Sequence, residues 1–292
     1  MALLMKRTSR DHCEKTRLNI KVFAFDFDKT CTIEPVLDIY KSREDYINNK
    51  KTLDNTWFEL VKSYSKSVGE VFHLLKNDTT FEFDEVGLRE FLRQVGIVDK
   101  MAMDRLISSN ILKGITVEGL HIFSRTVQLK PDVLTVLKNL MDFGLPLHLI
   151  SLNFSEQLIS FVLNRKTTLP IKIHSNNLVF HDGICTGNVE KKFITAVHKE
   201  AELDQLNQVG SGVIVYVGDS STDLLALLKA DIGIIIGNSP SLQHVCKAFG
   251  VEIISLNKWK SVYKYNNENS RTLFRANSWK EIEDFILRTS NY

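Results

Sequence analysis

The sequence predicts an α/β fold with a parallel sheet, helices on both of its faces, and a helical cap inserted after the first strand. Short apolar runs alternate with stretches of helical spacing, which is typical of a parallel sheet covered on both sides. The segment after the first run has helical spacing and lacks clear apolar strands. A chain of 292 residues is long enough for such a core and a small insertion.

Five apolar runs are the expected strands. The first, residues 21–27 (KVFAFDF), is rich in aromatics, and the others are residues 145–152, 212–217, 231–236 and 251–255. Helical spacing between them predicts helices over 131–143, 155–164, 191–202 and 223–229, with a closing amphipathic helix over 279–288. Ligands of such sheets bind at the carboxyl ends of the strands, so the polar residues there are the candidates for chemistry.

The helical insertion is expected to form a cap. Helical spacing is clearest in the series Trp57, Leu60, Val61, Tyr64 and Val68. We therefore expect a catalytic core of residues 18–35 and 127–292, a cap of residues 36–126, and an N-terminal extension of residues 1–17. Because the insertion leaves and rejoins the core near the strand ends, it could form a lid over the site.

Composition excludes several classes of partner. The net charge of +2 and the isoelectric point near 8.2 are too mild to indicate nucleic acid or an anionic membrane, and no apolar run approaches the roughly 20 residues that span a bilayer. The four cysteines are scattered without a CxxC pair, which favours a reducing compartment. The basic N-terminus lacks a signal-peptide apolar region, so the expected location is cytoplasmic, with mitochondrial targeting left open.

The first chemical motif, DFDKT, directly follows the first apolar run. Alternation places Asp26 and Asp28 on one side of the chain and turns Phe27 to the other. Two carboxylates that close repel each other unless a cation or a shared proton intervenes. The alternative is a polar strand end whose aspartates cap the following turn.

The second motif, GDSSTD, follows another apolar run and begins a helix. Asp219 is expected at the strand tip and Asp223 one helical turn later. Both also suit plain structural roles, as an N-cap and as a first-turn acid. Two strand tips that each present a carboxylate pair form an oxygen-rich site suited to Mg²⁺.

Neutral donors and a cation complete the candidate site. Ser151 and Asn153 follow the run at residues 145–152, and Lys191 and Lys192 begin a stretch of helical spacing. In isolation these are a turn and a solvated lysine pair, but phosphate transfer requires such groups to balance developing charge. The apolar spacing after Lys192 favours that lysine, with Lys191 as the alternative.

In this order, the motifs resemble those of the haloacid dehalogenase superfamily: Asp-x-Asp-x-Thr, Ser, Lys and Gly-Asp-x-x-x-Asp. The resemblance implies a Rossmann-like core with a C1-type cap. It also implies that Asp26 attacks phosphorus to form an aspartyl phosphate, while Asp28 acts as general acid and then base. The implied Mg²⁺ ligands are Asp26, the Asp28 main-chain carbonyl and Asp219, with Asp223 alongside. The implied phosphate-binding residues are Thr30, Ser151, Asn153 and Lys192.

Longer stretches are similar to a narrower group, the thiamin monophosphate phosphatase domain that plants carry behind a TenA-like domain. They are DFDKTCT (26–32), LDNTWFELVKSY (53–64), ILKGITVEGL (111–120), HSNNLVF with DGICTGNVEKK (174–192), and YVGDSSTDLLALLKADIGIIIGNSPSL (216–242). This resemblance implies a small phosphorylated metabolite as substrate, with thiamin monophosphate as the named one. Two departures are the lack of a TenA-like domain before Asp26 and a shorter loop around the predicted lysine.

Substrate contacts are expected from the cap. Trp57 and Tyr64 share a helix face and could stack on the flat, cationic rings of thiamin, or simply pack inside the cap. Glu34 could offer a carboxylate to such a cation, or be a solvated loop acid. The sequence leaves open a phosphatase for phosphoserine, a nucleotide or a pyridoxal-type phosphate, a phosphomutase, and a non-catalytic binding protein. It is compatible with a monomer or a dimer.

Overall fold

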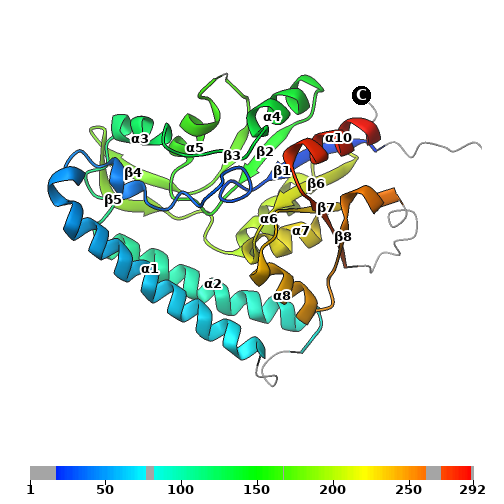
Figure 1. Cartoon of the computed structure of the whole chain (residues 1–292), viewed down its shortest axis with the longest axis horizontal. Helices are drawn as coiled ribbons and strands as arrows, with labels where there is room; N and C mark the ends of the chain where they lie inside the picture. The colour runs from blue at the N-terminus through cyan, green and yellow to red at the C-terminus, as the bar shows by residue number, and fades with distance from the viewer. Residues whose placement is uncertain (1–17, 77–81, 167, 261–270, 291–292) are drawn as a thin grey trace, which may run out of the picture.

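A computed structural model describes residues 18–76, 82–166, 168–260 and 271–290 (Figure 1). Its main feature is a seven-stranded sheet of order β3-β2-β1-β6-β7-β9-β8, in which every neighbouring pair is parallel. The strands are β1 (Ile20–Phe25), β2 (Leu147–Ile150), β3 (Lys172–His174), β6 (Val213–Gly218), β7 (Ile232–Ile236), β8 (Glu252–Ser255) and β9 (Thr272–Ala276). The α/β fold with a parallel sheet is therefore confirmed. The predicted N-terminal extension lies outside the described residues.

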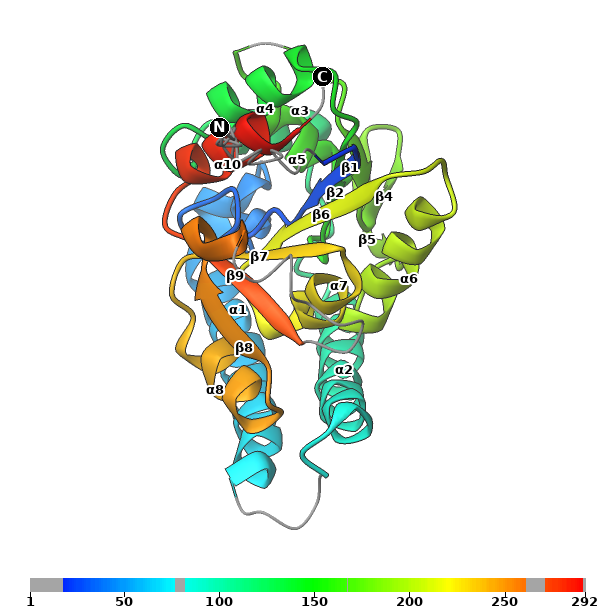
Figure 2. The same ribbon diagram turned by 90° about the vertical axis from the view of Figure 1, so that its right-hand side faces the viewer.

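Helices cover both faces of the sheet (Figure 2). Alternate residues of β1 enter two hydrophobic cores: Phe23 and Phe25 pack with helices of one face, and Val22 and Ala24 with helices of the other. The first face carries α4 (Val133–Asp142), α5 (Glu156–Leu163) and α10 (Trp279–Thr289). The second carries α6 (Ala196–Asn207), α7 (Leu224–Lys229) and α8 (Pro240–Ala248).

Each predicted strand corresponds to a strand of the sheet, but several elements were missed. β3 is only three residues long and partly exposed, and β9 includes Arg275, so neither presents an apolar run. An antiparallel hairpin of β4 (Asn177–His181) and β5 (Ile184–Glu190) was also missed. Its turn is Asp182-Gly183, both with positive φ, which is the chemistry of a tight hairpin.

The helix predicted over 191–202 begins later than expected. The hairpin continues to Glu190, and α6 starts at Ala196. Thr195 is the N-cap, and its hydroxyl and backbone N–H both lie within hydrogen-bond distance of His198 Nδ1. This shift moves the first turn of the helix away from Lys191 and Lys192.

Residues 36–126 contribute helices: the 3₁₀ helix η1 (Ile39–Ser42), α1 (Tyr46–Lys76), α2 (Glu85–Ser108) and α3 (Val117–Ser124). The long helices α1 and α2 lie side by side at one edge of the molecule (Figure 1). The domain boundaries at residues 36 and 126 stay a prediction. No described helix combines the length and apolarity needed to cross a membrane.

The C-terminal helix α10 supports the loop that follows β1. Trp279, at the start of α10, is 1% exposed, and its ring centroid lies 6.4 Å from that of Phe23 and 5.7 Å from that of Phe25. Its indole Nε1 donates a hydrogen bond of 2.9 Å to the main-chain carbonyl of Thr30. A side chain from the end of the chain thus fixes the backbone of the DFDKT loop.

We expect Trp279→Phe to lower the free energy of unfolding by about 2 kcal/mol, because it leaves a buried carbonyl without its donor and removes ring volume. Urea denaturation followed by far-UV circular dichroism measures this change. An unchanged unfolding midpoint would contradict the supporting role of the indole N–H.

Candidate active site

The carboxylates of two motifs meet at the carboxyl ends of adjacent strands. Asp26 follows β1 and Asp219 follows β6, and the two strands pair in parallel. The Asp26 N–H donates to the Val217 carbonyl at 3.0 Å, which continues this pairing to the aspartate. Carboxylate oxygens of Asp26, Asp219 and Asp223 all lie within 4.8 Å of one another, and all three residues are buried.

The cation in this cluster is Lys199, from the first turn of α6. Its Nζ lies 2.7 Å from Asp26 Oδ1 and 2.7 Å from Asp223 Oδ1, and its side chain is 1% exposed. Burial opposes the charge of Lys199, but Asp223 and Asp26 raise its pKa, so it is held as a cation. Lys199 therefore bridges the two acidic motifs, DFDKT and GDSSTD.

The predictions for Lys192 and for its alternative Lys191 do not match this geometry. Lys192 is about half exposed and pairs with Glu190 at 3.1 Å, while Lys191 pairs with Asp104 at 2.7 Å. Both lie between β5, which ends at Glu190, and α6, which begins at Ala196, and their ammonium groups pair with these exposed acids. Lys199 was missed because the sequence of α6 has almost no apolar periodicity; the cap at Thr195 is the signal that could have located it.

Donors surround the carboxylate of Asp223. Besides Lys199, the Tyr216 hydroxyl donates to Oδ1 at 2.8 Å and the Ser220 hydroxyl to Oδ2 at 3.0 Å, and the backbone N–H groups of Asp219 and Ser220 also donate to Oδ2. Burial alone would raise the pKa of Asp223, but Lys199 and these donors hold it below its ordinary value. Asp223 is therefore ionised and fixed in position.

The negative charges of Asp26 and Asp219, the other two acids of the cluster, are less well compensated than that of Asp223. Burial raises the pKa of Asp26 well above its ordinary value, opposed by Lys199 and reinforced by Asp223 and Asp219. Burial and Asp223 raise the pKa of Asp219 to about 7, opposed by Lys199 and by a hydrogen bond of 3.1 Å from the Thr30 hydroxyl. Lys199 alone does not balance the three carboxylates. A hard divalent cation with oxygen ligands, such as Mg²⁺, fits this donor set.

Asp28 lies beside the cluster and has its own partners. Its carboxylate accepts hydrogen bonds from the Val36 N–H at 2.6 Å and from Asn153 Nδ2 at 2.9 Å. Burial raises the pKa of Asp28 above its ordinary value, although the hydrogen bonds from Asn153 and Val36 oppose the shift. The buried Ser151 hydroxyl accepts from the Asn153 N–H at 3.2 Å, so Asn153 connects Asp28 to Ser151.

Asn176, which the sequence reading missed, joins the loops around the site. Its Nδ2 donates to the carbonyls of Leu152, Asn153 and Phe193, and its Oδ1 accepts from the N–H groups of Lys192 and Phe193. It is fully buried. One side chain thus connects the loop of Ser151 and Asn153 to the segment that leads into α6 and Lys199.

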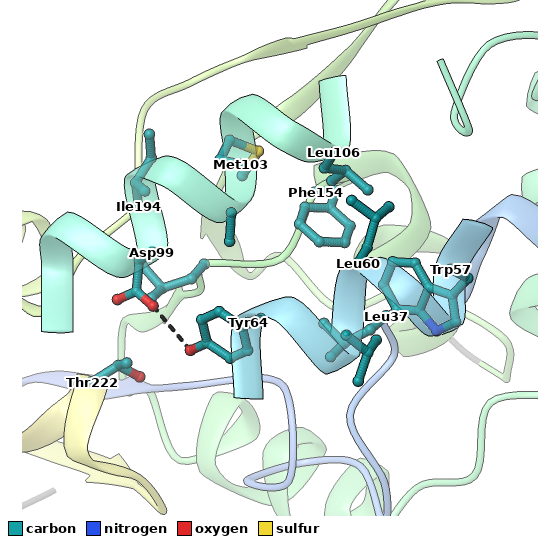
Figure 3. A pocket seen from close by; sticks show the side chains of 13 residues that line it. Leu37, Trp57, Leu60, Tyr64, Asp99, Met103, Leu106, Phe154, Ile194 and Thr222 are labelled. Carbon is teal, nitrogen blue, oxygen red and sulfur yellow. Dashed lines mark hydrogen bonds between the residues drawn. The ribbon is translucent and has the colours of Figure 1, made fainter. Parts of the chain in front are cut away.

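The aromatic cap residues line a cavity of about 210 Å³ between α1, α2 and the catalytic loops (Figure 3). Trp57 and Tyr64 both face it, while Trp57 also packs on Tyr40 with ring centroids 5.5 Å apart. Glu34 does not reach this cavity. It is exposed in the loop after Thr32, whose hydroxyl binds the Glu34 carbonyl, and it lines a separate hollow with Lys41.

Comparison with known proteins gives matches at two levels, sequence and fold. No family model matches the chain. The chain is 28% identical, over 97% of its length, to the bifunctional TH2 protein, mitochondrial, of Arabidopsis thaliana, and spans about half (51%) of that protein.

Solved structures match the fold. A substrate-bound phosphoserine phosphatase complex has a TM-score of 0.55 at 16% identity, covering 92% of this chain and 99% of that one. A protein of unknown function from Bordetella pertussis Tohama I has a TM-score of 0.50 at 16% identity, covering 80% and 96%. The chain therefore has the haloacid dehalogenase-type α/β fold of a phosphoserine phosphatase and is similar, over nearly its whole length, to part of a bifunctional plant protein.

Proposed function

We propose that this chain is a magnesium-dependent phosphomonoesterase that uses Asp26 as a covalent nucleophile. The observation that carries the proposal is the contact of Lys199 with both Asp26 and Asp223 at the carboxyl ends of the strands. A lysine held there reduces the repulsion between Asp26 and an incoming phosphate dianion. It also fixes the carboxylate in one orientation.

The first step transfers the phosphoryl group to the protein. A carboxylate oxygen of Asp26 forms a bond to phosphorus as the ester P–O bond breaks, and the electron pair of that bond stays on the leaving oxygen. The Asp28 carboxyl gives its proton to this oxygen, which leaves as an alcohol. The raised pKa of Asp28 supports its role as the acid.

The second step returns the protein to its starting state. A water oxygen bonds to phosphorus while Asp28, now a carboxylate, takes a proton from that water. The bond between phosphorus and Asp26 breaks, the carboxylate of Asp26 re-forms, and inorganic phosphate leaves. Lys199 and the Ser151 hydroxyl are the proposed ligands of the phosphoryl oxygens in both steps; support comes from the contact of Lys199 with Asp26 and from the hydrogen bond that joins Ser151 to Asn153.

The proposed Mg²⁺ site consists of the Asp26 and Asp219 carboxylates and the main-chain carbonyl of Asp28, with Asp223 alongside. When bound, the ion neutralises charge on the phosphoryl oxygens. Its support here is the set of buried carboxylates around a single lysine. Thr30 orients Asp219, and Asn153 orients Asp28.

The proposed substrate is thiamin monophosphate. Support comes from the stretches that resemble the plant thiamin monophosphate phosphatase domain, from the similarity to a bifunctional plant protein across 97% of this chain, and from the aromatic residues Trp57 and Tyr64 beside the site. We propose the cytoplasm as the location; the mitochondrial relative makes the mitochondrion the alternative, and cell fractionation decides between them.

Phosphate release from a panel of phosphomonoesters tests the proposal. With Mg²⁺, we expect selective turnover of thiamin monophosphate over phosphoserine, nucleotides and pyridoxal phosphate, loss of turnover on chelation, and a fall of at least about 10³-fold in Asp26→Asn. Turnover of other esters alone would reject the substrate while keeping the mechanism. Full activity in Asp26→Asn would reject the mechanism.

A further inference from the structure

The cavity under the cap opens beside the catalytic residues. Its wall includes Leu152, between Ser151 and Asn153, and Thr222, directly before Asp223. A phosphate bound at the cluster would therefore place the organic part of its ester in or next to this cavity. The remaining wall comes largely from α1 and α2, as Figure 3 shows.

Most residues of this wall are apolar. Among the described residues that line it, Asp99 is the sole charged one. Tyr64 donates its hydroxyl hydrogen to Asp99 Oδ1 at 2.9 Å (Figure 3). The second oxygen, Oδ2, is buried and has no hydrogen-bond partner among the described residues. No basic side chain of the described lining is present to balance the carboxylate.

An unpaired carboxylate oxygen in an apolar wall is costly, because it has lost water without gaining a donor. Burial accordingly raises the pKa of Asp99 to about 7, although the Tyr64 hydroxyl opposes the shift. Packing alone does not account for a carboxylate at this position. A ligand that brings a positive charge or an N–H group to Oδ2 would remove the cost, and a ligand with neither would not.

We propose that Asp99 determines specificity, by pairing with a cationic or N–H-bearing aromatic ring in the organic part of the substrate. Trp57 and Tyr64 lie two helical turns apart on the same side of the cavity, so a flat ring fits against them while its charged or N–H edge reaches Asp99. This inference rests on the proposed function and names the substrate class of that site.

The test compares Asp99→Asn with wild type on two esters. Thiamin monophosphate carries a cationic ring and an amino group, whereas p-nitrophenyl phosphate has neither. Asparagine keeps the shape and an acceptor for Tyr64 but removes the charge. We expect kcat/KM for thiamin monophosphate to fall by about 10- to 100-fold, mainly through KM, with p-nitrophenyl phosphate changed less than threefold.

The control is Asp104→Asn, which alters an exposed carboxylate on the same helix, paired with Lys191, and should change neither ester. Equal losses on both esters in Asp99→Asn, or no loss on either, would overturn the specificity role. Thermal melting should stay at or above the wild-type midpoint, because the substitution removes a buried charge.

Calorimetric binding of thiamin itself separates this inference from the proposed function. If wild type hydrolyses neither ester, the phosphatase proposal fails. Weaker thiamin binding by Asp99→Asn than by wild type and Asp104→Asn would still support the pairing. Equal affinity in all three proteins would overturn it.

Discussion

Lys199→Met should reduce phosphate release by about 10²- to 10³-fold or more, because it removes the one cation that contacts both Asp26 and Asp223 among the described residues. Methionine has a similar length and no charge, so the variant isolates the loss of the ammonium group. The expected fall is in kcat, since Lys199 offsets the repulsion between Asp26 and the phosphate as the new bond forms. Initial rates over a range of substrate concentrations measure it.

The same variant should also be less stable at neutral pH. Removing one partner of a buried ion pair leaves the other charge uncompensated, which typically costs about 3–5 kcal/mol. Excess Mg²⁺ should recover part of this loss, because a bound cation relieves the same carboxylates. Urea denaturation with and without Mg²⁺ measures both quantities.

Lys192→Met is the matched control for Lys199→Met. Lys192 is partly exposed and pairs with Glu190, and such surface pairs contribute about 0–1 kcal/mol. Its activity should stay within about twofold of wild type. A large loss in Lys192→Met with little change in Lys199→Met would reverse the assignment and favour the lysine that the sequence suggested.

These two lysines show what the sequence could and could not predict. The acidic pairs were found because each follows an apolar strand, and parallel strands bring their carboxyl ends to one edge. Asp26 and Asp219 were therefore expected at the same edge of the sheet, whereas the pairing of β1 with β6 that makes them neighbours is seen only in the structure. Lys199 belongs instead to a helix that begins after the cap at Thr195, and its start was predicted too early because the preceding hairpin, whose second strand has no continuous apolar run, was missed.

The sequence around Asn176 and around Asp99 does not indicate their roles, for a related reason. Asn176 gains its role from carbonyls of Leu152, Asn153 and Phe193, which are distant in sequence or follow an unpredicted hairpin. Asp99 is one of several acids on α2, and only the packing of α1 against α2 shows that its Oδ2 faces no donor. The role of such a residue depends on packing between segments distant in sequence, which the periodicity of apolar residues does not show.

Gly218→Ala should destabilise the protein by about 2–3 kcal/mol and reduce activity at least about 10²-fold. Gly218 ends β6, and a methyl group there would lie 2.6 Å from both Cβ and Cγ of Asp223. Asp223 cannot retreat cheaply, because Lys199 and Tyr216 hold its carboxylate at 2.7 and 2.8 Å. The added carbon must therefore displace Asp223, and with it the bridge to Asp26.

Gly69→Ala provides the matched control, since it makes the same chemical change within α1, where an added methyl group meets nothing within 4 Å. Alanine is preferred over glycine inside a helix, so this variant should be more stable by about 0.5–1 kcal/mol at unchanged activity. Urea denaturation and phosphate release compare the pair. If Gly218→Ala retained wild-type stability and rate, the close approach of strand and carboxylate would have no part in fixing Asp223, and the rigid bridge from Asp223 through Lys199 to Asp26 would lose its main structural support.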